Sequence, residues 1–171
     1  RKMALEEAFN IPRTRCQTDQ TMLNVLSASA KTLGVLGFKA YTTNRRGTRF
    51  HVTLYDGKTG EMLFLMQGDW LGRYRTGAAS GVATKYLARP ESSVLAVLGS
   101  GTQAFTQALA VATVRNLKEV RVFSKTPEKR DAFAKHLTET LKLNAVAGSS
   151  AEEAVRGADV VCTATSSREP V

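Results

Sequence analysis

The sequence predicts an α/β protein whose two halves are built differently. Residues 35–66 contain three strand patterns separated by the turn-rich segments NRRG and DGKTG, which predicts an antiparallel meander. Residues 92–165 alternate short apolar strands with helical patterns, which predicts a parallel sheet with right-handed crossovers. We therefore expect one domain over residues 1–90 and a second over residues 91–171.

The first half is rich in strand signals. VLGFKAYTT, TRFHVTLYD and GEMLFLMQ have the length and composition of strands. In RFHVTLYD apolar and polar residues alternate, which indicates a strand with one buried face. Upstream of these strands, IPRTRCQ is expected to be extended after Pro12.

The second half begins with the strand SVLAVLG, and three helix–strand pairs follow. The helical patterns are TQAFTQALAVATVRN, TPEKRDAFAKHLTETLKL and AEEAVRG, and the further strands are EVRVFS, NAVAGS and DVVCTAT. Thr126 followed by Pro127 is a helix-start signal, and so is Ser150 with Glu153 three residues later. These signals fix where two of the helices should begin.

Composition narrows the classes of function. The 171 residues are 43% hydrophobic and 23% charged, which is typical of a globular protein, and no apolar run has the ~18–20 residues of a membrane span. The net charge is +9, but the basic residues are scattered among few aromatics, so we expect small anionic ligands rather than nucleic acid. Cys16 and Cys162 lie far apart without metal-ligand spacing, which predicts no metal site and a reducing, cytoplasmic location.

A glycine-rich turn in VLAVLGSGTQA carries the main functional signal. Gly99, Gly101 and Ala104 follow a strand and open a helix, in the G-x-G-x-x-G/A pattern of Rossmann dinucleotide-binding folds. The first glycine permits the tight turn, the second lets the pyrophosphate approach, and the small third residue permits close helix packing. The alternative is a tight turn that binds no ligand.

The end of the second parallel strand predicts which dinucleotide binds. NAD-binding folds place an acidic residue there for the ribose hydroxyl, but this chain has Ser124, followed by Lys125, Thr126 and Arg130. Cations and hydroxyls can bind a 2′-phosphate, so we expect NADP(H) rather than NAD(H). The alternative for Lys125 and Arg130 is ordinary surface charge on the helix.

The fourth parallel strand ends in hydroxyl side chains. Thr165 and Ser166 follow it, at the strand end that faces the ligand crevice in such folds. We expect them to contact ribose or nicotinamide. The alternative is simple termination of the strand.

Three cations outside the parallel sheet are candidate substrate residues. Lys39 lies inside an otherwise apolar strand, where a desolvated lysine can act as an acid or base. The alternative is a solvated lysine on an edge strand. Arg13 and Arg15 share one face of an extended segment and could bind a carboxylate, or could simply be solvated.

The segment RYRTGAASG, residues 73–81, is predicted to begin a helix that ends before Pro90. Basic residues oppose the helix dipole at such a start, so a bound anion is expected there. The small residues Gly77, Ala78 and Ala79 would let a dinucleotide lie close to this helix.

Together these motifs resemble the ornithine cyclodeaminase/mu-crystallin family. The resemblance lies in IPRTR, GFKAYTT, GDWLGRYRTGAASGVATKYLA and VLGSGTQA, in the family's order and spacing. It implies a substrate-binding and dimerisation domain on an antiparallel sheet, here within 1–90, and a Rossmann domain, here partly within 91–171. It also implies a homodimer that binds NAD or NADP and acts on amino acids or cyclic imines.

The resemblance also assigns residues. It implies that Lys39 is the active-site lysine, that Arg15 (or its neighbour Arg13) binds the substrate carboxylate, and that Arg75 is a second substrate arginine close to the cofactor. It adds further cofactor contacts, which are Thr48, Thr76, Ser100, Thr102 and Gln103. In cyclodeaminating members a catalytic aspartate follows the fourth Rossmann strand, in a segment beyond Val171, so we expect the chain to be part of a longer protein.

Three functions are consistent with these residues. The first is an amino-acid or imine oxidoreductase that transfers hydride at the substrate α-carbon, of the alanine dehydrogenase or ketimine reductase type. The second is an ornithine cyclodeaminase, and the third is a non-catalytic binder of NADPH and a small ligand. The first is our prediction.

Overall fold

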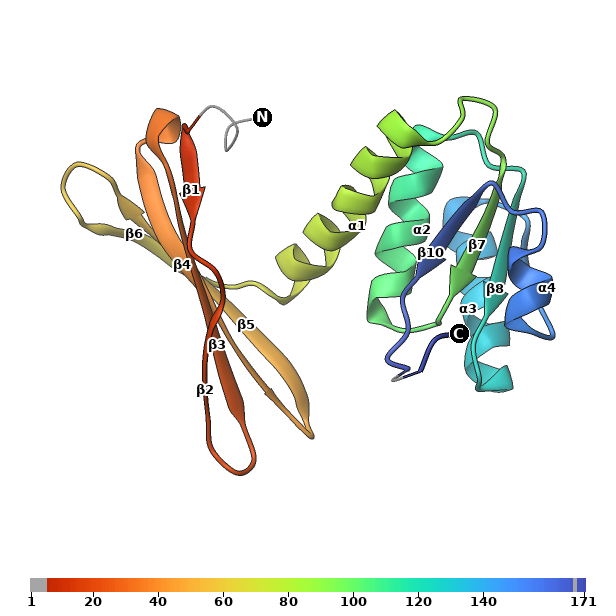
Figure 1. Ribbon diagram of the computed structural model, residues 1–171, viewed down its shortest axis with the longest axis horizontal. Helices are drawn as coiled ribbons and strands as arrows, with labels where there is room; N and C mark the ends of the chain where they lie inside the picture. Colours follow the sequence, from red (N-terminus) through yellow and green to blue (C-terminus); the bar gives the residue numbers. More distant parts are fainter. Residues whose placement is uncertain (1–5, 168) are drawn as a thin grey trace. The chain divides into compact units, whose positions relative to one another are not determined.

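The computed structural model describes residues 6–167 and 169–171, which form two compact units. One unit ends at Gly72 and the other begins at Arg73. Figure 1 shows a sheet without covering helices in the first unit and a sheet with helices on both faces in the second. The predicted α/β class is therefore confirmed.

The first unit is an antiparallel sheet. Its strands run in the order β1-β3-β4-β5-β6, and β2 also pairs with β3. The strands are β1 (Ala8–Asn10), β2 (Thr14–Gln17), β3 (Met22–Ala30), β4 (Val35–Asn44), β5 (Gly47–Asp56) and β6 (Met62–Gln67), with the 3-10 helix η1 (Lys31–Leu33) between β3 and β4. The three strands predicted within 35–66 are confirmed as β4, β5 and β6, and the extended IPRTRCQ segment contains β2. The long strand β3 was not predicted.

The second unit contains a four-stranded parallel sheet in the order β10-β7-β8-β9. Its strands are β7 (Val94–Leu98), β8 (Glu119–Phe123), β9 (Ala145–Ala147) and β10 (Val160–Thr163), and its helices are α2 (Thr102–Val114), α3 (Pro127–Leu141) and α4 (Ala151–Val155). Helices α3 and α4 begin at the predicted caps, Thr126 and Ser150. This strand order is that of a doubly wound sheet.

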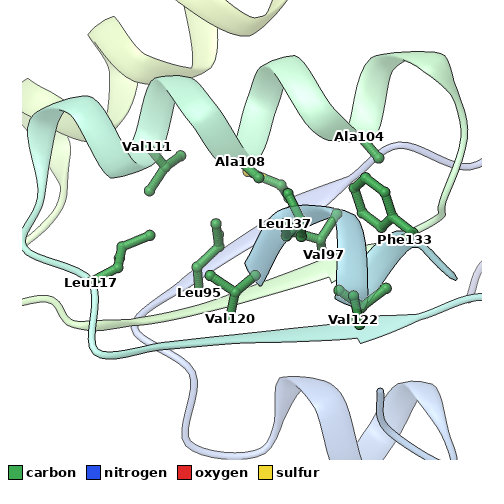
Figure 2. Close-up of a cluster of buried hydrophobic side chains, with 12 residues drawn as sticks. Leu95, Val97, Ala104, Ala108, Val111, Leu117, Val120, Val122, Phe133 and Leu137 are labelled. Atoms are coloured by element: carbon green, nitrogen blue, oxygen red, sulfur yellow. The ribbon is translucent and has the colours of Figure 1, made fainter. Parts of the chain in front are cut away.

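The core of the second unit lies between the sheet and the helices α2 and α3. Figure 2 shows side chains of β7 and β8 facing those of the two helices. Leu95, Val97, Val120, Val122 and Leu137 are fully buried there. Because β7 is covered on both faces, it reads as a continuous apolar run, as parallel strands do.

Helix α1 (Asp69–Leu87) begins four residues earlier than predicted. Asp69 lies in its first turn, where the dipole favours an acidic residue, and its carboxylate accepts a hydrogen bond from the Phe50 backbone N–H at 3.1 Å. Arg73 and Arg75 therefore lie beyond the first turn. The prediction that the helix begins with basic residues is therefore wrong, and the dipole argument for an anion at this helix start no longer applies, whereas the predicted role of Arg75 as a substrate ligand is not tested by this.

The small residues of α1 serve helix packing instead. A Cβ on Gly77 would lie 2.3 Å from the Thr106 carbonyl oxygen of α2, and one on Gly81 would lie 3.1 Å from Ala110. Ser80, between the glycines, donates a hydrogen bond to Gln107 at 2.9 Å. Ala78 and Ala79 are exposed. The expectation that Gly77 makes room for a dinucleotide is thus overturned by the contact with α2.

Asp159 fixes the start of β7. Its carboxylate accepts hydrogen bonds from the backbone N–H groups of Ser93 and Val94 at 2.9 and 3.0 Å, and from Arg89 at 2.7 Å. These bonds hold the pKa of Asp159 below its ordinary value, with the two backbone N–H groups as the main cause.

Across the described residues, no helix has both the length and the apolar character that crossing a membrane requires.

Candidate functional site

The glycine-rich turn has the geometry that its sequence predicts. Gly99 has φ +116°, and a Cβ there would lie 2.3 Å from the Ala164 carbonyl oxygen, so only glycine fits. Gly101 caps α2 without a side-chain hydrogen bond, and a Cβ on it would meet nothing within 4 Å. Ala104 is fully buried against the sheet. The turn therefore leaves open space over the N-terminus of α2.

This open space belongs to a cleft of about 880 Å³. It is formed by the turn, the carboxyl ends of β7, β8 and β10, and the start of α3. The predicted cofactor residues that line it are Gly99, Ser100, Gly101, Thr102, Gln103, Ser124, Lys125, Thr126, Thr165 and Ser166. The fold thus brings together residues from three separate segments of the sequence.

The charge of the cleft is positive. Among the described residues that line it are Lys125 and Lys129 but no aspartate or glutamate. Ser100 donates a hydrogen bond to the Ser124 hydroxyl at 3.0 Å, which ties the turn to the end of β8. An anionic group would therefore meet two ammonium groups and two hydroxyls.

Arg130 does not line the cleft, although it was a candidate. Its side chain is 17% exposed and lies 3.4 Å from Asp131. It also contributes to lowering the pKa of Glu153, after the larger effect of hydrogen bonds from Ser149. Successive helix residues point about 100° apart, and Lys129 is the one that lines the cleft.

Two glutamines on α2 border the same cleft. The Gln103 side-chain oxygen is buried and has no hydrogen-bond partner among the described residues. Gln107 lies one turn further along α2, and its own side-chain oxygen accepts the bond from Ser80. Sequence reasoning missed Gln107, although the i, i+4 spacing from Gln103 places both on one helix face.

An unpaired buried acceptor, open space over a helix N-terminus and an excess of cations all fit a dinucleotide. Arg75, Thr76 and Thr48 do not line this cleft. Arg75 is exposed and Thr76 half-buried on α1. Thr48 belongs to the first unit, where its hydroxyl lies 3.4 Å from that of Thr43. The roles predicted for these three residues stay predictions.

The substrate candidates of the first unit lie on one face of its sheet. Arg15, Asn24, Tyr41 and Phe50 stand opposite one another on β2, β3, β4 and β5. Arg13, Arg15, Asn24 and Tyr41 border a hollow of about 500 Å³. Side chains two residues apart on a strand share a face, so Lys39 lies on the same face as Tyr41.

Lys39 lies on β4, which has β3 and β5 on either side. The alternative of a solvated lysine on an edge strand is therefore wrong. Its Nζ lies 5.2 Å from the ring centroids of both Tyr41 and Phe50, and the Arg13 guanidinium lies 5.7 Å from the Tyr41 ring. Aromatic faces attract cations, so both rings make cation–π contacts with the Lys39 side chain.

The parallel sheet, its crossover helices and the glycine-rich turn define the second unit as a Rossmann-type unit, the class of fold that binds dinucleotides. The whole chain, residues 1–171, matches the ornithine cyclodeaminase/mu-crystallin family, and it belongs to that family.

Two curated relatives show the range of the family. The chain is 36% identical over 160 residues to Delta(1)-pyrroline-2-carboxylate reductase of Bacillus cereus. This alignment covers 90% of this chain and 49% of that protein. It is 38% identical over 120 residues to ketimine reductase mu-crystallin of Rattus norvegicus. This second alignment covers 70% of this chain and 37% of that protein. The chain thus spans about half or less of the length of these relatives.

The fold is similar to a solved structure of the same kind. Delta(1)-pyrroline-2-carboxylate reductase of Thermococcus litoralis, in complex with NADH and L-proline, superposes with a TM-score of 0.93 at 32% sequence identity. The match covers 99% of this chain and 55% of that one.

Proposed function

We propose that the protein is an NAD(P)-dependent oxidoreductase that acts on a cyclic imine or an amino acid. The observation that carries this proposal is the cationic cleft around the Gly99–Gln103 turn, in a chain whose relatives include imine reductases. When bound, the nicotinamide supplies or accepts hydride at its C4 atom. The residues of the turn would hold the pyrophosphate against the N-terminus of α2.

The sheet face of the first unit supports binding of the substrate. A guanidinium binds a carboxylate through two parallel hydrogen bonds, which suits Arg15. Lys39 would donate a proton to the substrate nitrogen during reduction and accept it during oxidation. Its contacts with Tyr41 and Phe50 hold the side chain on the sheet face that also carries Arg15. Arg75 is proposed as a second carboxylate ligand from α1.

The cleft favours NADP(H) over NAD(H) within this proposal. Ser124 stands where an acidic residue would bind the ribose hydroxyls of NAD, and Lys125 and Lys129 lie close by in the same cleft. The solved relative from Thermococcus litoralis holds NADH, so this proposal gives the two proteins different preferred coenzymes. The 2′-phosphate would be recognised by the two lysines with Ser124 and Thr126.

Further parts of the proposal follow from the family. We infer a cytoplasmic homodimer in which residues 1–90 bind substrate and mediate dimerisation, while residues 91–171 bind the dinucleotide. Light scattering of the purified protein tests the dimer. A monomer at micromolar concentration would contradict it.

The direct test is reduction of a cyclic imino acid by the purified protein with NADPH and with NADH. We expect turnover with NADPH, and its loss in Lys39→Ala while NADPH binding persists. Turnover that survives Lys39→Ala would refute the role of Lys39.

The alternative functions give different results in the same assays. Ammonia release from ornithine without net oxidation or reduction of NAD(P)H would identify a cyclodeaminase. NADPH binding without turnover of any imine or amino acid would identify a non-catalytic binder.

A further inference from the structure

Asn24 is an unusual residue for its position. It is the third residue of β3 and is only 3% exposed, although asparagine is depleted in strands. A buried polar side chain needs a hydrogen-bond partner, because leaving it unpaired costs free energy. Its presence in the sheet therefore calls for a function that an apolar residue could not supply.

The partner is Arg15. The two residues face each other across β2 and β3, and the Arg15 Nε–H donates to the Asn24 side-chain oxygen at 3.2 Å. This bond uses Nε, and the two terminal nitrogens of the guanidinium have no hydrogen-bond partner among the described residues. Arg15 also borders the hollow of about 500 Å³.

Arg13 differs from Arg15 in this respect. Its guanidinium lies over the Tyr41 ring at 5.7 Å, and the part of the chain that the structure describes offers it no hydrogen-bond acceptor. A cation–π contact restrains position but leaves the plane of the fork less well defined than a hydrogen bond does. Of the two arginines, Arg15 is the one whose fork is held in a fixed orientation.

We propose that Asn24 is a positioning residue that holds Arg15 so that its two terminal nitrogens bind a substrate carboxylate, which makes Arg15 rather than Arg13 the carboxylate ligand. This inference rests on the proposed function, because it takes the ligand to be an amino or imino acid. It adds a residue to the site that neither the glycine-rich turn nor the strand patterns indicated.

The test is a double-mutant cycle on the purified protein. Asn24→Leu removes the acceptor and replaces the polar side chain with an apolar one of similar size. We expect the KM for the imino acid to rise about tenfold, as for one lost charge-assisted hydrogen bond, with kcat and the NADPH Kd little changed. In an Arg15→Ala background, Asn24→Leu should have no further effect on KM, because Asn24 acts through Arg15.

Two further comparisons separate positioning from a structural role. Thr53→Val removes another buried polar side chain of this sheet, also 3% exposed, and should leave KM unchanged. Arg15→Lys keeps the charge but loses the fork and the Nε bond, so KM should rise. Arg13→Lys should change KM by less than about twofold. These arginine variants decide which arginine binds the carboxylate even if Asn24→Leu folds poorly.

An unchanged KM in Asn24→Leu, or an equal rise with and without Arg15, would overturn the positioning role. Failure of the proposed function is distinguishable, because the wild-type protein itself would then reduce no imine. In that case L-proline affinity decides the inference, since it should fall in Asn24→Leu. A wild-type protein that neither reduces an imine nor binds L-proline would overturn both.

Discussion

The two glycines of the turn should respond oppositely to the same substitution. Gly99 has φ +116° and would place a Cβ 2.3 Å from the Ala164 carbonyl oxygen. Gly101 has φ −85° and would place a Cβ in open space. Alanine at Gly99 should therefore damage the fold, whereas alanine at Gly101 should damage ligand binding.

The magnitudes follow from these contacts. In Gly99→Ala the disfavoured backbone costs about 1–3 kcal/mol and the overpacking costs a further 1–3 kcal/mol, so unfolding should need about 2–6 kcal/mol less. In Gly101→Ala the backbone is allowed and the weaker helix cap costs below about 1 kcal/mol. Its new methyl group occupies the space for the pyrophosphate, so the Kd for NADPH should rise at least about tenfold.

Urea unfolding followed by circular dichroism gives the stabilities, and titration calorimetry gives the Kd values. A Gly99→Ala variant as stable as the wild type would refute the close approach to Ala164. A Gly101→Ala variant that binds NADPH as tightly as the wild type would refute the role of the turn.

Three further predictions concern neighbouring features. Lys129→Gln should raise the Kd for NADPH about tenfold with little effect on the Kd for NADH. The control Arg130→Gln should change neither of these Kd values. Equal effects of the two variants in calorimetric titrations would contradict the prediction. Gly77→Ala should lower the free energy of unfolding by about 1–3 kcal/mol in urea, because the new Cβ would meet Thr106. The control Gly72→Ala places its Cβ in open space and should not destabilise the protein. Equal stability of Gly77→Ala and the wild type would refute the packing role. Asp159→Asn should lower stability at neutral pH. Because the folded-state pKa of Asp159 lies below the ordinary value of 3.8, the carboxylate stabilises the fold above that value. The difference from wild type should disappear as pH falls through the folded-state pKa, and a difference that persists in acid unfolding curves would count against this origin.

The elements that the sequence predicted well are those with strong local signals. Apolar runs marked β7 and β10, alternation marked β5, and the caps Thr126 and Ser150 marked the starts of α3 and α4. The fingerprint residues Gly99, Gly101 and Ala104 also predicted their own geometry, because each glycine role is a backbone property.

What the sequence missed depends on neighbours that it does not show. The start of α1 at Asp69 is set by a bond to Phe50, and Gly77 is small because α2 packs against it. Lys129 lines the cleft in place of the candidate Arg130 because of the direction in which each side chain leaves α3. The pairing of Asn24 with Arg15 depends on the strand register between β2 and β3. In each case the decisive contact is non-local.

Titration calorimetry of the wild-type protein with NADPH and NADH tests the central claim most directly. We expect that both bind and that NADPH binds at least about tenfold tighter, because the described residues that line the cleft include Lys125 and Lys129 but no aspartate or glutamate. Tighter binding of NADH would contradict the 2′-phosphate assignment. Binding of neither coenzyme would contradict the assignment of the cleft itself.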